Sequence, residues 1–86
     1  MGSKTFDGVR FMAYPADLDP PHVHATTAGV ILVLALLADG GVDLADRKDA
    51  ISPSSAPRNV VAKIQRVAAE NVGDLWALWE KVHGAR

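Results

Sequence analysis

The sequence predicts an α+β fold in which a four-stranded antiparallel β-meander packs against one or two C-terminal helices, in the order ββββα(α). Three observations predict it. Short apolar or alternating segments bounded by Gly and Pro fill the first half of the 86 residues, as is typical of strands. From Arg58 onward the apolar residues recur at helical spacing instead. Every expected strand connection is short, so the meander needs no crossover.

A mass of 9.1 kDa predicts one domain over residues 1–86, because domains usually hold on the order of 100 residues. Within it, we expect a flexible leader over 1–5 and the β-sheet over 6–46. A polar connection over 47–57 and a helical part over 58–84 complete the chain.

The first two strands are expected over residues 8–14 and 22–27. Residues 8–14 alternate between two faces, and Pro15 ends the strand because it has no amide hydrogen for the ladder. The dipeptide Pro20-Pro21 stiffens the chain ahead of the second strand. The alternation places Val9, Phe11 and Ala13 on one face, and it places Arg10, Met12 and Tyr14 on the other.

The third strand is expected over residues 30–38, after a turn at 28–29. Its continuous apolar run predicts a central strand that is covered on both faces. A buried helix is the alternative, but the glycines on both sides favour a strand. The turn over 39–41 then leads into a shorter, more exposed fourth strand over 42–46.

The helical part begins after Ser55, a candidate cap, with Pro57 tolerated in the first turn. The pattern is interrupted near Asn71, so one kinked helix and two separate helices both fit. Asn71 is a candidate cap for a second helix, with Asp74 three positions later. The two apolar stripes are Val60, Val61, Ile64, Val67 and Ala68, then Val72, Leu75, Trp76, Trp79 and Val82.

The composition excludes several function classes. Without cysteine there is no disulfide scaffold, thiolate zinc site or cysteine nucleophile. A net charge of −1 makes nucleic acid an unfavourable partner. No apolar run approaches the roughly 20 residues of a membrane helix, and the N-terminal residues lack a signal-peptide core. We therefore expect a cytoplasmic protein with no membrane contact, whose small core favours a homodimer or a partner protein.

One segment has side chains that could bind a metal ion or transfer protons. Its sequence is Asp17-Leu18-Asp19-Pro20-Pro21-His22-Val23-His24. On a strand, His22 and His24 point to the same face, within reach of one metal ion. No cofactor is firmly predicted, but Zn²⁺ or Mn²⁺ is the candidate, with Asp17 or Asp19 as a carboxylate ligand. His83 or Glu80 could approach the same ion from the helical part. The same two histidines are the candidate catalytic acid and base. The alternative, which spacing alone favours, is two histidines that simply bond to carbonyls and carboxylates.

Trp76 and Trp79 lie three residues apart on the expected helix, and they are candidate anchors for a partner protein. The alternative, which we favour, is that they fill the core, because the chain has only five aromatic residues (Phe, Trp and Tyr). Arg58, Lys63 and Arg66 are better explained as a solvated helix face than as contacts to a nucleic-acid backbone.

The chain also resembles domain of unknown function family 4160, whose members are small bacterial proteins with a Pro-Pro-His-Phe-His signature. The resemblance spans about residues 6–84. It departs at Leu18, where the family usually has a histidine, and at Val23, where it usually has an aromatic residue. If that extra histidine is a ligand in the family, its absence weakens a metal role here. The matching positions are Pro20, Pro21, His22, His24, Asn71, Leu75 and Trp79.

The resemblance implies a component of a two-gene cassette that is toxin–antitoxin-like. It predicts a small interaction protein, or a mobile-element accessory factor, that binds a partner protein encoded by a neighbouring gene. The first alternative is a metal-dependent hydrolase that acts on a phosphodiester or nucleotide through His22 and His24. The second is a nucleic-acid-binding regulator, which the charge disfavours. The balance favours a binding protein over an enzyme.

Overall fold

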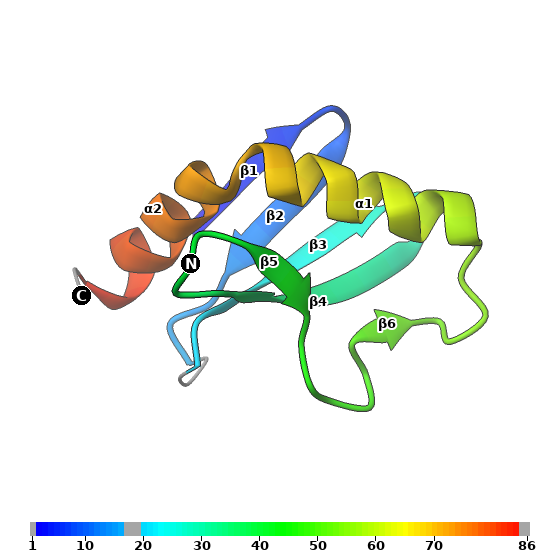
Figure 1. The fold of residues 1–86 in the computed structure, drawn as a ribbon, viewed down its shortest axis with the longest axis horizontal. Coiled ribbons are helices and arrows are strands. Elements are labelled where there is room, and N and C mark those ends of the chain that lie inside the picture. The colour runs from blue at the N-terminus through cyan, green and yellow to red at the C-terminus, as the bar shows by residue number, and fades with distance from the viewer. Residues whose placement is uncertain (1, 17–19, 85–86) are drawn as a thin grey trace.

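An antiparallel sheet is covered on one face by two C-terminal helices, so the predicted α+β class is confirmed (Figure 1). The computed structural model describes residues 2–16 and 20–84. The sheet has five strands in the order β1-β2-β3-β4-β5, and a short sixth strand also pairs with β4. The strands are β1 (Gly2–Phe6), β2 (Val9–Ala13), β3 (His22–Thr27), β4 (Val30–Leu36), β5 (Val42–Leu44) and β6 (Ile51–Ser52).

The prediction of four strands is wrong at the N-terminus, because β1 forms where we expected a flexible leader. This strand pairs with β2 from Phe6 opposite Val9 to Gly2 opposite Ala13. The two strands meet at an Asp-Gly turn in which both residues have positive φ, a typical hairpin signal. The three middle residues of this strand are polar and exposed. The strand therefore lacks the apolar alternation by which a strand is predicted from sequence.

The prediction is also too simple at the connection over residues 47–57, which contains β6. The outer edge of β4 is shared by two short strands: β5 pairs with Leu34–Leu36 and β6 with Ile31–Leu32. Between them, the Val33 amide donates to the Ala50 carbonyl, and the Val33 carbonyl accepts from the Ala45 amide. Residues 46–49 loop out from this edge, so β5 ends at Leu44 rather than at Asp46.

The core lies between the sheet and the helices. In β4 the alternate residues Val30, Leu32, Leu34 and Leu36 are all buried in it. The strand is central, as its apolar run predicts. Its second face is covered only in part, because Val33 is 2% exposed whereas Ile31 is 43% exposed.

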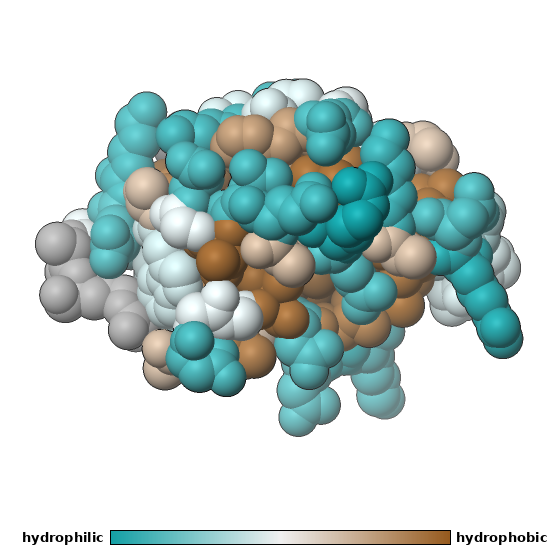
Figure 2. Space-filling model, turned by 45° about the horizontal axis from the view of Figure 1, so that its top comes forward, coloured by the Kyte–Doolittle hydropathy of each residue, from teal (hydrophilic) through white to brown (hydrophobic). Residues whose placement is uncertain are grey.

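The helical part forms two helices, α1 (Arg58–Glu70) and α2 (Val72–His83). Helix α1 packs over β3, β4 and β5, whereas α2 packs mainly over β1 and β2. Polar side chains cover much of the outer side of the helices, with apolar surface visible between them (Figure 2). Their buried residues are Ile64, Val67, Ala68, Leu75, Leu78 and Trp79. Among the described residues, no helix is both long and apolar enough to cross a membrane.

Neither predicted cap makes a side-chain hydrogen bond to the helix that it was expected to start, although Asn71 does occupy the N-cap position of α2. Helix α1 starts after Pro57, whose carbonyl accepts from the amides of Val60 and Val61, and no side chain caps it. The Asn71 side chain does not cap α2 either. It instead donates from Nδ2 to the Val67 carbonyl at 2.8 Å, so that it satisfies a free carbonyl at the end of α1. Asn71 therefore separates the helices by closing the first of them.

We expect Asn71→Asp to lower the free energy of unfolding by about 1–2 kcal/mol, because the carboxylate keeps the shape but cannot donate to Val67. The new charge lies between the carboxyl end of α1 and the amino end of α2, so its interactions with the two helix dipoles oppose each other. Urea unfolding measures the change. The matched control, Asn59→Asp, lies on an exposed position in the first turn of α1 and should be neutral or stabilising. Equal losses in the two variants would contradict this role for the Asn71 amide.

Candidate functional site

His22 and His24 lie on the sheet face that is turned away from the helices. In β3 the residues between and after them, Val23 and Ala25, are fully buried in the core, whereas both histidines are half-buried. His24 is paired with Met12 of β2. The two ring centroids are 5.5 Å apart, with a 64° angle between the planes. The same-face geometry that the spacing predicts is therefore present.

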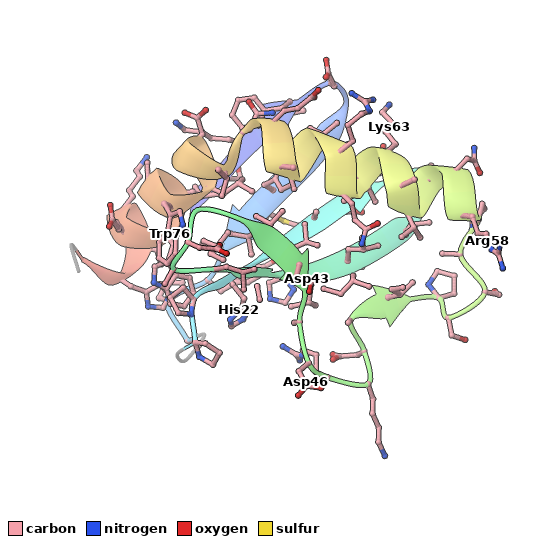
Figure 3. All side chains as sticks on the ribbon, in the orientation of Figure 1. His22, Asp43, Asp46, Arg58, Lys63 and Trp76 are labelled. Atoms are coloured by element: carbon pink, nitrogen blue, oxygen red, sulfur yellow. The ribbon has the colours of Figure 1, made fainter. Side chains whose placement is uncertain are left out.

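The backbone fixes the proton position on His22. Its Nδ1 lies 2.9 Å from the Pro20 carbonyl, which only accepts, so Nδ1 carries the hydrogen. In the neutral ring the lone pair then lies on Nε2. The Nε2 atoms of both His22 and His24 are withdrawn from solvent. The side of the His22 ring that faces away from Pro20 is thus inside the protein. Figure 3 shows His22 below the sheet, away from α1.

The histidine pair belongs to an aromatic cluster of five rings: Tyr14, His22, His24, Trp79 and His83. Centroid distances are 5.0 Å from Tyr14 to His24 and 5.5 Å from His22 to Trp79. The His83 ring stacks on Trp79 at 3.7 Å and 20°. Its Nε2 donates to the Tyr14 carbonyl at 2.9 Å, which ties the end of α2 to the end of β2. The cluster thus joins the sheet to the last helix.

Sequence reasoning did not single out Tyr14 as part of this site. A signal for it was present, because Tyr14 follows Met12 by two residues and therefore shares its face of the sheet. The link from His83 to Tyr14 joins residues 69 positions apart, so local spacing carries no trace of it.

The other predicted metal ligands, Asp17 and Asp19, lie outside the described residues. Among the residues that the structure describes, no group of three or more His, Asp or Glu side chains is arranged to hold a metal ion.

A charged loop borders the histidine pair. Arg47 donates from both Nε and Nη2 to the Asp49 carboxylate, the second bond measuring 2.9 Å. The hydrogen bond from Arg47 holds the pKa of Asp49 below its ordinary value, and the charge of His24 acts in the same direction. Asp49 is thus near enough to interact electrostatically with a positive charge at His24.

The two tryptophans differ in exposure. Trp79 is 3% exposed and belongs to the core, where it contacts His22 and His83. Trp76 is half-buried against the edge of the core, at the α2 end of the molecule (Figure 3). Of the two candidate anchors, Trp76 is the one with surface to offer a partner.

Together these features define a small two-layer α+β protein with a histidine-centred aromatic cluster at the end of its sheet. No family model matches the chain, and no curated protein or solved structure matches it either. The resemblance to domain of unknown function family 4160 therefore stays a prediction.

We expect His83→Phe to lower the free energy of unfolding by about 1 kcal/mol, because the phenyl ring keeps the stack on Trp79 but loses the hydrogen bond to Tyr14. His83→Ala loses both contacts and should cost more. Thermal or urea unfolding measures both variants. If His83→Phe is as stable as the parent protein, the tie between α2 and β2 contributes nothing.

Proposed function

We propose that the protein acts by binding a partner protein on the sheet face that α1 and α2 leave uncovered. The supporting observation is the exposure of two large apolar side chains along the central strand. Ile31 is 43% exposed and Leu37, directly after β4, is 37% exposed, whereas Val33 between them on the same face is buried. Water contact with these side chains is unfavourable, and a partner that covered them would gain roughly 25 cal/mol per Å² of apolar surface.

The charge on this face favours a protein over a nucleic acid. Asp43 of β5 is exposed and pairs with Ala35, which lies two positions before Leu37 in the sequence. Asp46, which follows β5, is exposed as well. With a net charge of −1 the chain has no excess of positive charge for phosphates. The partner that we propose is the product of a neighbouring gene, as in the toxin–antitoxin-like cassettes that the family resemblance implies.

The test is to produce the protein together with the product of the adjacent gene and to measure the affinity of the purified pair by calorimetry. Ile31→Lys should weaken the complex about tenfold or more, because a charge would then be buried at the interface. The control, Ala62→Lys, adds the same charge to an exposed position of α1 and should leave the affinity unchanged. Equal affinities of the Ile31 variant and the parent protein would contradict the proposal.

Sedimentation of the protein alone shows whether this face binds a distinct partner protein or a second copy of the same chain. We expect a monomer whose state Ile31→Lys does not alter. A dimer that Ile31→Lys dissociates would mean that the face is occupied by another copy, and the proposal of a distinct partner would fail. Trp76→Ala shows whether the contact extends to α2, because a half-exposed tryptophan at an interface commonly contributes about 2 kcal/mol or more.

A further inference from the structure

The histidine pair has geometric properties that partner binding does not use. Its two rings stand side by side on β3, with centroids 5.5 Å apart. Two imidazoles that bind one tetrahedral ion through nitrogens at about 2.1 Å have ring centres about 5 Å apart. The separation in this protein is therefore close to what a shared ion requires, before any side chain moves.

The hydrogen bond to Pro20 prepares His22 for such a role. A metal-bound histidine commonly donates its second ring N–H to a carbonyl or carboxylate, which fixes the tautomer and the ring direction. His22 Nδ1 makes this bond at 2.9 Å, which leaves the lone pair on Nε2. The stiff Pro20-Pro21 dipeptide precedes it, and the Trp79 ring lies 5.5 Å away on another side. The ring is thus oriented by its surroundings.

The histidine pair is sheltered from water. The Nε2 atoms of His22 and His24 are withdrawn from solvent. The Asp49 carboxylate, which interacts electrostatically with His24, is already paired with Arg47. The described chain has no cysteine, and imidazole nitrogen suits Zn²⁺, Cu²⁺, Ni²⁺ and Co²⁺ better than it suits Mg²⁺ or Ca²⁺.

We propose that His22 and His24 together bind one transition-metal ion of the zinc, copper, nickel or cobalt class, with Nε2 of His22 as a ligand. Two protein ligands from β3 leave coordination positions for water or another small donor. Such an open position is what a hydrolytic metal centre would need. The binding itself is a property of the isolated chain, and it does not depend on the proposed partner.

Trp79 provides a built-in reporter. Cu²⁺ quenches the emission of a nearby indole, whereas Zn²⁺, with its filled d shell, does not, and Trp79 contacts His22 directly. In a Trp76→Phe background Trp79 is the sole tryptophan. Titrating this metal-free protein with Cu²⁺ should quench the emission and saturate at one ion per chain. Because Cu²⁺ binds nitrogen sites more tightly than Zn²⁺, a large excess of Zn²⁺ should be needed to displace it and restore the emission.

Two variants and one matched control locate the ion. His22→Gln and His24→Gln should each weaken Cu²⁺ binding about tenfold or more. His83→Gln is the control, because His83 stacks on the opposite side of the same reporter at 3.7 Å. It should keep the parent affinity. Quenching that survives in His24→Gln but disappears in His83→Gln would place the ion elsewhere and overturn the proposal.

Circular dichroism and a melting curve of each metal-free variant show whether it folds. If His22→Gln does not fold, the comparison of His24→Gln with His83→Gln still decides the question, because those residues lie on different elements. Unchanged Cu²⁺ affinity in a folded His24→Gln protein also overturns the proposal.

Discussion

Phe11→Ala is expected to lower the free energy of unfolding by about 3–5 kcal/mol, the range for removing a large aromatic side chain from a core. Phe11 is 0% exposed and lies in the middle of β2, on the face covered by the helices. Its ring is also 6.1 Å from that of Phe6. Since small domains are often stable by little more than about 5 kcal/mol, the variant should be largely unfolded in mild urea.

The neighbouring residue on β2 is the control for this prediction. Met12 points to the opposite face and is half-buried, so Met12→Ala should cost well under half as much as Phe11→Ala. Urea unfolding at 25 °C measures both. Equal losses would contradict the placement of the core between β2 and the helices.

Trp79→Ala should destabilise the protein by a similar amount, about 3–5 kcal/mol, because Trp79 is 3% exposed in the core. It should also change the surroundings of two histidines, since the ring contacts His22 and stacks on His83. We expect the ring-proton signals of both histidines to shift in NMR spectra.

Trp76→Ala is the matched change on the same helix. Trp76 is half-buried and contacts the core from its edge, so its loss should cost about 1–2 kcal/mol. The His83 signals should move less than in Trp79→Ala. If the two variants are equally destabilised, the difference in burial between the tryptophans has no energetic consequence.

The strands with strong local signals were predicted well. For β3 the predicted range of residues 22–27 is the observed one, because Pro21 and the Ala28-Gly29 turn bound it on both sides. For β4 the apolar run predicted a central strand, and the sheet order confirms that position. The local sequence pattern therefore predicts the position of strands that are apolar and flanked by turns.

The short polar strands were beyond the same reasoning. β1 has three exposed polar residues and is held by its pairing with β2, while β6 has two residues and is held by β4. Such strands form because a neighbour offers free backbone groups, not because of their own side chains. The side-chain cap expected from Asn71 is absent for a related reason. An asparagine between two helices can hydrogen-bond to the end of the first or to the start of the second, and here it bonds to the first.

The candidate site was predicted in part. The spacing of His22 and His24 placed both rings on one face of a strand, as observed. The ring stack of His83 on Trp79 was not predicted, and neither was the bond from His83 to the Tyr14 carbonyl, because these contacts arise when α2 packs against the end of the sheet. Spacing along a chain describes one element at a time, whereas the cluster is assembled from three.

The close approach of β1 to α2 has a consequence for the order of folding. A Cβ atom on Gly2 would lie 2.9 Å from Leu78 Cδ1 and 3.2 Å from Val82 Cγ2, so the strand and the helix meet at this point. These contacts join residues that lie 76 and 80 positions apart in the sequence. The β1-β2 hairpin is paired locally, but its packing against α2 requires the helical part of the chain. We expect this long-range contact to form late in refolding and to slow the completion of the core.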